Sequence, residues 1–311
     1  MKLIKKHFLL YLFILPTLIF LFIFHYLPIY ESKLAFQKYK IIGPNEWVGF
    51  KYFNILFNNS AFYNVLRNTV IISTMKIAFT FPIPIILALT LNEVRKLSHR
   101  RFFQSILYIP HFLSWVIISG IFISMLSINN GAVNNIIQLM GNEPINFLTN
   151  ANYVRWILVI SEIWRSAGWD SVLYIAAIYS INQELYDSAK IDGASRWQQV
   201  IFITLPMIVP MMITVFILNL GFFLSAGFDQ IFNLMNAATL SRIDIIDTYV
   251  YRVGLLQGNF SLSIAGGLFK GFFGFILILS THFLAKKYTG RGLWLSLIHI
   301  SEPTRLGMSS Y

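Results

Sequence analysis

The stretch NQELYDSAKIDGASRWQQVIFITLP, residues 182–206, is a polar segment that joins two long apolar runs at residues 153–179 and 205–227. Crossing the hydrocarbon core of a bilayer takes about 20 helical residues, and both runs are long enough. The polar segment is too rich in charged and amide side chains to remain in lipid. It therefore predicts a loop at one membrane face, between two transmembrane helices.

Working outward from this loop, the chain contains further apolar runs of similar length. The composition is 56% hydrophobic and 12% charged, about half the charged fraction of an ordinary soluble domain. These features predict an all-α membrane protein with about six transmembrane helices. The predicted spans cover residues 8–28, 68–91, 104–126, 153–179, 205–227 and 260–285. We expect the first to be a retained span, because it is too long for a signal peptide and ends at His25-Tyr26-Leu27-Pro28 without small cleavage-site residues.

The distribution of lysine and arginine predicts the orientation, because cytoplasmic loops carry an excess of both. With the N-terminus inside, the cytoplasmic segments contain Lys2, Lys5, Lys6, Arg95, Lys96, Arg100, Arg101, Lys190, Arg196, Lys286, Lys287 and Arg291. The external loops contain Lys33, Lys38, Lys40, Lys51, Arg242 and Arg252. This bias places both termini in the cytoplasm. It also explains the net charge of +11 by membrane topology, so no nucleic-acid partner is needed to account for it.

The order of spans suggests four segments along the chain. These are an N-terminal transmembrane helix (1–30), an external segment (31–67), a transmembrane core (68–287) that contains the loop 182–206, and a C-terminal tail (288–311). Residues 295–311 lack periodicity and resemble translated cloning or sequencing-adaptor DNA. We expect them to be non-native, with the natural end near Gly292-Leu293-Trp294.

The loop itself predicts two short helices. Asn182 can cap the first, and Glu184 in its first turn suits the helix dipole. Gly193 can supply the left-handed residue that ends it. Ser195 with Gln198 three residues later forms a capping box for the second helix, and Pro206 suggests a bend where the chain re-enters the bilayer. Such a stiff element can transmit force, although an ordinary amphipathic loop helix would give the same pattern.

Three motifs in this loop resemble the "EAA…G…LP" coupling loop of ABC importer permeases: Asp187-Ser188-Ala189, Asp192-Gly193-Ala194 and Ile203–Pro206. The family's Glu-Ala-Ala is replaced by Asp-Ser-Ala. Further similarity lies at Val48–Phe50, Asn68-Thr69, Leu91–Arg95, Tyr108–Phe112 and Asp244–Arg252. Together these motifs are similar to the LplB-like branch of the maltose-type oligosaccharide permeases.

The resemblance implies a type I (MetI-like) ABC importer transmembrane domain in the bacterial plasma membrane. It implies a heterodimer with a second related permease, two copies of a separate ABC ATPase, an extracytoplasmic solute-binding (lipo)protein and an oligosaccharide substrate. The chain itself would then be no enzyme and need no cofactor. The residues expected to couple to the ATPase are Glu184, Asp187, Ser188, Ala189, Asp192, Gly193, Ala194, Leu205 and Pro206.

Polar residues inside predicted spans are costly in hydrocarbon, so they should face a cavity or a partner. In the fourth span, Glu162, Arg165 and Trp169 fall on one helical stripe. Glu162 and Arg165 are three residues apart and either pair with each other or line the substrate path directly. Trp169 offers a flat face for a sugar ring, but an aromatic near a span end is also a common packing anchor. The fifth span and its external end add Asn219, Ser225 and Asp229 as path candidates; for Asn219, the resemblance also implies substrate contact.

The sequence contains no Gly-x-x-x-x-Gly-Lys-Ser/Thr phosphate loop and no His-Glu-x-x-His or Cys-x-x-Cys metal pattern. It has no cysteine at all. A catalytic or metal-binding role is therefore not indicated. Two alternatives to the permease remain at this stage: a secondary transporter, which would show inverted repeats, and a non-transporting membrane sensor or assembly factor, which would leave the polar stripe unexplained.

Overall fold

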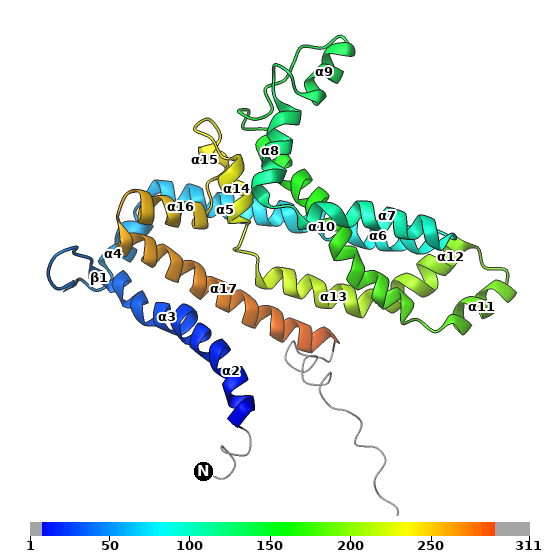
Figure 1. Ribbon diagram of the computed structural model, residues 1–311, viewed down its shortest axis with the longest axis horizontal. Helices are drawn as coiled ribbons and strands as arrows, with labels where there is room; N and C mark the ends of the chain where they lie inside the picture. Colours follow the sequence, from blue (N-terminus) through cyan, green and yellow to red (C-terminus); the bar gives the residue numbers. More distant parts are fainter. Residues whose placement is uncertain (1–7, 290–311) are drawn as a thin grey trace, which may run out of the picture. The chain divides into compact units, whose positions relative to one another are not determined.

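The computed structural model describes residues 8–289 and is almost entirely helical (Figure 1). The chain forms two compact units. One comprises the chain up to Tyr63 together with Ile246–Gly271, and the other comprises Asn64–Ile245 together with the chain from Phe272. The expected tail segment beyond residue 289, including the residues 295–311 expected to be non-native, lies outside the described residues.

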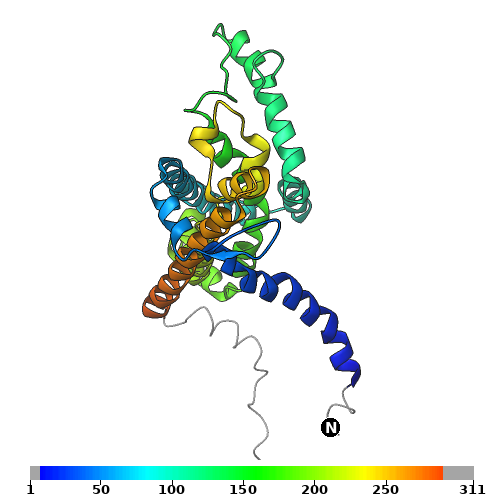
Figure 2. The same ribbon diagram turned by 90° about the vertical axis from the view of Figure 1, so that its left-hand side faces the viewer.

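The first unit begins with a continuous helical run and adds short elements around it. Its elements are α2 (Phe8–Leu21), a π-helical turn (Phe22–Tyr26), α3 (Leu27–Glu31), a 3-10 helix (Ser32–Phe36), β1 (Gln37–Lys38), β2 (Glu46–Trp47), α4 (Lys51–Phe57), the start of α5 (Ser60–Thr80), α16 (Ile246–Tyr251), a π-helical turn (Arg252–Leu256) and the start of α17 (Phe260–Thr289). The run from α2 to α3 is curved in both views (Figures 1 and 2), which the inserted π-helical turn explains.

Two polar contacts and an aromatic cluster hold the first unit. The antiparallel β1–β2 pair is fixed to α17 by the Ser261 hydroxyl, which donates to the Gln37 carbonyl at 2.7 Å. Lys270 of α17 donates to both carboxylate oxygens of Asp247 on α16, at 2.6 and 2.8 Å. Phe62, at 1% exposure, packs its ring against Tyr249.

The second unit contains the remaining helices. They are α6 (Pro82–Glu93), α7 (Leu97–Tyr108), a 3-10 helix (Ile109–Phe112), α8 (Trp115–Leu126), α9 (Ala132–Leu139), α10 (Val154–Tyr179), α11 (Gln183–Ile191), α12 (Arg196–Gln199), a π-helical turn (Val200–Thr204), α13 (Leu205–Gly221), α14 (Phe228–Leu234) and α15 (Leu240–Ile243), with most of α5 and the end of α17.

Helix α10 is the centre of this second unit and packs against α6, α7, α8 and α13. A Cβ atom at Gly168 would lie 2.1 Å from the backbone oxygen of Leu107, so only glycine permits this close approach. Two apolar clusters pack against the helix, one along its first turns and one along its last. One contains Ile72, Leu158 and Ile231, and the other contains Ala88, Tyr174 and Ile208.

The spans expected from the sequence correspond to helices, with two corrections. Four helical runs within residues 8–289 are long and apolar enough to cross a membrane: Tyr11–Phe36, Ser60–Glu93, Arg196–Gly221 and Phe260–Phe283. With the bent pair described next counted as one span, the described residues contain up to five such spans by length and composition. Helix α10 covers the expected fourth span, but its charged residues keep it out of this set.

The expected third span, 104–126, is wrong as a continuous helix. The chain bends by 103° between Leu97–Phe112 and Trp115–Leu126 (Figure 1). Pro110 lies in the 3-10 helix before the bend, where its ring opposes continuation of an α-helix. The Ser114 side chain then accepts a hydrogen bond from the Ile117 N–H and starts the new helix.

The expected bend at Leu205-Pro206 does not interrupt the helix. Helix α12, the π-helical turn Val200–Thr204 and α13 form one uninterrupted run from Arg196 to Gly221. The Leu205 N–H donates to the Val200 carbonyl five residues back. This wider turn accommodates Pro206, which has no N–H to offer to a regular α-helical turn. The helix that begins at Arg196, after α11 and its loop, is therefore continuous with the fifth span.

Candidate functional site

The loop helix α11 has the ends that the sequence predicts. The Asn182 side chain accepts a hydrogen bond from the Glu184 N–H at 3.1 Å, and Gly193 has a φ of +80°. The Ser195–Gln198 capping box is complete, because each side chain accepts a hydrogen bond from the other residue's backbone N–H. A nine-residue helix is unstable alone, so these caps define its length.

The exposed face of α11 carries a charged pair. Lys190 donates to Asp187 at 2.8 Å. This hydrogen bond and the charge of Lys190 hold the pKa of Asp187 below its usual value. Asp187 is therefore ionised at neutral pH. Neighbouring Ser188 donates to the Glu184 carbonyl within the helix.

Helix α11 is also tied to the start of the fifth span. The hydroxyls of Tyr186 and Thr204 lie 2.8 Å apart and share a hydrogen bond. Figure 1 shows α11 between the end of α10 and the run from α12 to α13. The Tyr186–Thr204 hydrogen bond joins α11 to the helical run that contains α13.

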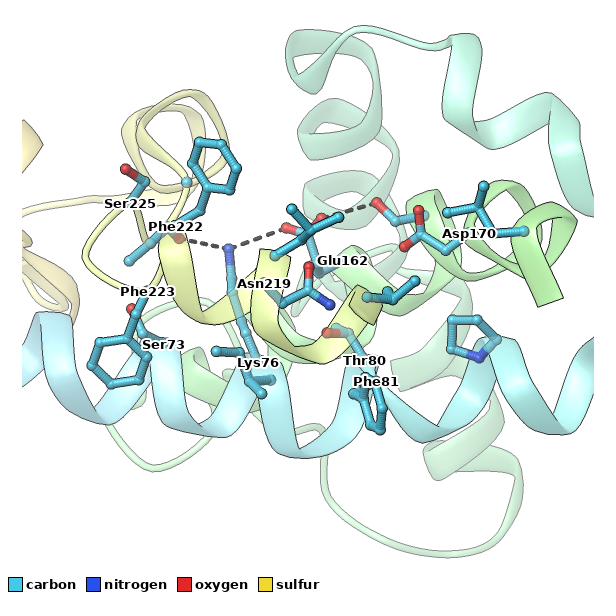
Figure 3. Close-up of a pocket in the computed structure, with 18 of the residues that line it drawn as sticks. Ser73, Lys76, Thr80, Phe81, Glu162, Asp170, Asn219, Phe222, Phe223 and Ser225 are labelled. Carbon is cyan, nitrogen blue, oxygen red and sulfur yellow. Dashed lines mark hydrogen bonds and ion pairs between the residues drawn. The ribbon is translucent and has the colours of Figure 1, made fainter. Parts of the chain in front are cut away.

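A second site is a cavity of about 450 Å³ between α5, α6, α10, α13 and the chain that follows α13 (Figure 3). Its polar lining comes from Ser73, Lys76, Thr80, Glu162, Ser166, Asp170, Asn219 and Ser225. Its aromatic lining comes from Phe81, Trp115, Tyr174, Phe222 and Phe223. Of the path residues expected from the sequence, Glu162, Asn219 and Ser225 line this cavity.

The expected Glu162–Arg165 pair is wrong. Glu162 pairs instead with Lys76 of α5, with 3.1 Å between the Lys76 Nζ and the Glu162 Oε2, and accepts a hydrogen bond from Ser166 at 2.9 Å. The guanidinium of Arg165 lies 5.1 Å from the ring centre of Trp115. Three-residue spacing allows two side chains to meet, but a buried lysine on another helix is a stronger partner for the carboxylate.

Two other expected path residues lie outside the lining of this cavity. Trp169 stacks on His111, with ring centres 4.8 Å apart and planes at 8°, so its exposed flat face is already covered on one side. Asp229 is exposed on α14. Trp169 thus follows the packing alternative that the sequence left open.

Lys76 connects three other residues of the site, although the sequence patterns did not single it out. Its ammonium donates to Glu162, to the Ala226 carbonyl at 2.7 Å and to the Gln230 side-chain oxygen. Only 8% of the residue is exposed. The sequence did contain a signal for Lys76, because a lysine in the middle of an apolar run needs a polar or charged partner.

Lys76 stabilises a stretch of non-helical chain between α13 and α14. There Ala226 lies outside any helix, so its carbonyl has no helical N–H to accept from. Gly227, the next residue, has a φ of +96°. A Cβ at Gly227 would lie 2.8 Å from the Lys76 ammonium. Gln230 completes the network by donating to the Leu158 carbonyl at 2.7 Å and to Ser161 at 2.8 Å. Irregular backbone at membrane depth occurs where it lines a cavity and its polar groups have partners.

A stiff loop helix at one membrane face, joined to a span that lines a polar cavity, defines a membrane permease driven by a separate motor. The chain matches the family model described as the binding-protein-dependent transport system inner membrane component over residues 80–290. It belongs to this family. It is a multi-pass inner-membrane protein, the permease of an ABC importer, in which ATP hydrolysis lies in a separate subunit. Family membership decides against the secondary transporter and the non-transporting sensor.

Among its relatives are two proteins of Bacillus subtilis. The polygalacturonan/rhamnogalacturonan transport system permease protein is 42% identical, with 94% of this chain and 92% of the relative covered. Protein LplB is 41% identical, with 94% and 93% covered. Among solved structures, a bacterial ABC transporter involved in the import of the acidic polysaccharide alginate has a TM-score of 0.86 at 39% identity, covering 93% of this chain and 98% of that one. A second structure, of the alginate transporter in complex with alginate pentasaccharide-bound periplasmic protein, has a TM-score of 0.87 at 39% identity. The match covers 94% of this chain and 99% of that one.

The Lys76–Glu162 pair leads to a stability prediction. Lys76→Met or Glu162→Gln alone should each lower the free energy of unfolding by about 3–5 kcal/mol, because each leaves a buried polar group without its partner. The double variant should lose less than the sum of the two. Thermal unfolding of the detergent-solubilised protein measures this coupling. The same cycle on Glu162 and Arg165 is the control and should give a much smaller coupling energy; equal coupling in both cycles would contradict the assignment of Lys76 as the partner.

Proposed function

We propose that this permease forms, with a second related permease, the channel through which oligosaccharides released by a solute-binding protein cross the plasma membrane. Two copies of a separate ATPase supply the energy by moving α11. One observation carries the proposal: the run from Arg196 to Gly221 is a single helix that receives α11 at one end and presents Asn219 to the cavity near the other. Movement at the loop therefore reaches the cavity through one rigid element.

The cavity supports a sugar as the substrate class. Sugar rings offer hydroxyl groups and apolar faces, which match neutral polar side chains and aromatic rings. Asn219 and Ser225 are exposed in the cavity lining, and their side chains make no hydrogen bond with another residue of the described chain. They remain available to a ligand. One relative is named for a polygalacturonan/rhamnogalacturonan transport system, and a similar solved structure is involved in the import of alginate, which supports an oligosaccharide.

The partners follow from the same arrangement. The apolar side chains of α2 whose exposure the structure describes, among them Phe8, Phe13 and Phe20, are exposed, as expected for a surface covered by lipid or by a second permease. A periplasmic protein is bound in the related alginate transporter, which supports a solute-binding protein as the donor of the substrate. The exposed Asp187–Lys190 face of α11 is the surface that we assign to the ATPase.

The orientation of the chain is part of the proposal. The excess of lysine and arginine in one set of loops supports cytoplasmic termini. This orientation places α11 on the cytoplasmic side, where ATP is available. A reporter active only in the cytoplasm should be active when fused after Lys287 or at Lys96, and silent when fused near Asn130. An inactive reporter after Lys287 would reject this orientation.

Substitution of Asn219 tests the substrate path. Asn219→Ala should reduce oligosaccharide uptake by about two- to ten-fold at low substrate, the range for one lost hydrogen bond, while the ATPase still co-purifies. Thr214→Ala is the matched control, because Thr214 lies on the same helix but does not line the cavity. Normal uptake by Asn219→Ala at a normal protein level would reject this part of the path.

Substitution of Gly193 tests coupling. Gly193→Val should cost about 1–2 kcal/mol of backbone strain, because a β-branched residue is unfavourable at positive φ, and should tilt α11. Stimulation of ATP hydrolysis by the loaded binding protein and uptake should fall together in the reconstituted complex. Asp187→Arg should act in the same direction by reversing the charge offered to the ATPase.

Gly141→Val is the control for this experiment. Gly141 has a φ of +82° and, like Gly193, open space around the position of a Cβ, so the substitution introduces equal strain in a loop remote from α11. It should leave stimulation unchanged. Full stimulation and normal ATPase retention in Gly193→Val and Asp187→Arg would contradict the coupling role of α11.

A further inference from the structure

The turn between α6 and α7 is held by one arginine. Arg100 of α7 donates through one guanidinium nitrogen to the carbonyls of Asn92 and Val94, at 3.0 and 3.2 Å. Through the other it donates to the Tyr179 hydroxyl at 2.5 Å. Tyr179 is the last residue of α10, and α11 begins four residues later. Arg100 therefore ties the turn to the end of α10 that leads into the loop.

The same turn is tied to the other end of the loop. Glu93, the last residue of α6, forms an ion pair of 2.9 Å with Arg196, the first residue of α12. Arg196 directly follows Ser195 of the capping box, so its position is fixed by the cap. The residues before and after α11 are thus both attached to residues 92–94, although these lie about a hundred positions away in the sequence.

This arrangement gives α11 a second connection to the cavity. Helix α6 begins at Pro82, directly after α5, and the two form one membrane-spanning run from Ser60 to Glu93. That run carries Lys76, Thr80 and Pro84 of the cavity lining. The first connection runs through α13 to Asn219, on the other side of the cavity.

We propose that residues 92–94 form a second anchor of α11, through which its movement reaches α5 and α6. The inference rests on the proposed function, because it assumes that an ATPase moves α11. With both connections intact, α11 displaces the walls of the cavity at α13 and at α5–α6 together. With the second anchor broken, only α13 follows. Glu93, Arg196 and Arg100 are positioning residues; none of them lines the cavity.

The expected effect on folding stability distinguishes this positioning role from a purely structural one. Both members of the Glu93–Arg196 pair are substantially exposed, at 39% and 56%, and exposed pairs contribute little to folding stability. Breaking the pair should therefore leave the thermal unfolding temperature of the complex close to that of the wild type. The ratio of stimulated to basal ATP hydrolysis should change instead.

The experiment uses the reconstituted complex with its ATPase and its solute-binding protein. Glu93→Arg and Arg196→Glu should each lower the ratio of stimulated to basal hydrolysis by about two- to five-fold, the range for an exposed ion pair. The exchange of both residues should restore it. Glu46→Arg is the matched control, because it disrupts the exposed Lys40–Glu46 pair next to the β1–β2 hairpin and should leave the ratio unchanged.

Tyr179→Phe is a second, milder variant. It removes the hydroxyl that accepts the hydrogen bond from Arg100 and keeps the ring, whose centre lies 5.7 Å from the guanidinium. It should lower the ratio in the same direction with unchanged stability. A wild-type ratio in Tyr179→Phe and in both single charge variants would overturn the second anchor while leaving the proposed function intact. Failure of the double exchange to restore the ratio would overturn the pairing, and absence of stimulation in the wild-type complex would overturn the proposed function with it.

Discussion

The Lys76 ammonium is the constraint on which the transmembrane site depends. A lysine at this depth must have partners, since an unpaired charge in hydrocarbon is costly, and Lys76 finds them on two other segments of the chain. Glu162 supplies the opposite charge from α10, while Ala226 and Gln230 supply oxygens from the stretch after α13. Without this donor, the non-helical chain near Gly227 would have an unsatisfied carbonyl at membrane depth. The same lysine therefore accounts for the break between α13 and α14, for the position of Glu162 and for one wall of the cavity.

The cavity is lined by more acidic than basic charge, which bears on how a substrate is recognised there. Lys76 is neutralised by Glu162, and Asp170 adds a second carboxylate to the lining. The groups that this cavity offers to the proposed sugar substrate are therefore amide, hydroxyl and aromatic groups rather than a free cation of this subunit. Recognition by such groups is sensitive to the arrangement of hydroxyls, because each unpaired polar group in a closed site is unfavourable.

In the function that we propose, the loop helix is a short element that transmits force. Its caps set its length, Gly193 sets its end, and the Tyr186–Thr204 hydrogen bond joins it to the run that ends at Gly221. The π-helical turn is important here, because it lets Pro206 remain within one uninterrupted helical run from Arg196 to Gly221.

The sequence by itself determined the membrane class, the approximate spans and the local form of the loop. Apolar runs and helix caps are local patterns, because the interactions that produce them act within a few residues. The capping roles of Asn182, Gly193 and the Ser195–Gln198 box were therefore predictable. The partner of Glu162 was not, because Lys76 is 86 residues away and spacing along one helix gave a false candidate in Arg165. The ties from residues 92–94 to both ends of α11 were likewise decided by the tertiary structure. They and the Lys76–Glu162 pair depend on which distant residues the packing of the helices brings within hydrogen-bond distance, and a pattern in one segment does not contain that information. The bend after Phe112 and the unbroken helix through Pro206 rest on local features, which are Pro110 with the Ser114 cap and the π-helical turn.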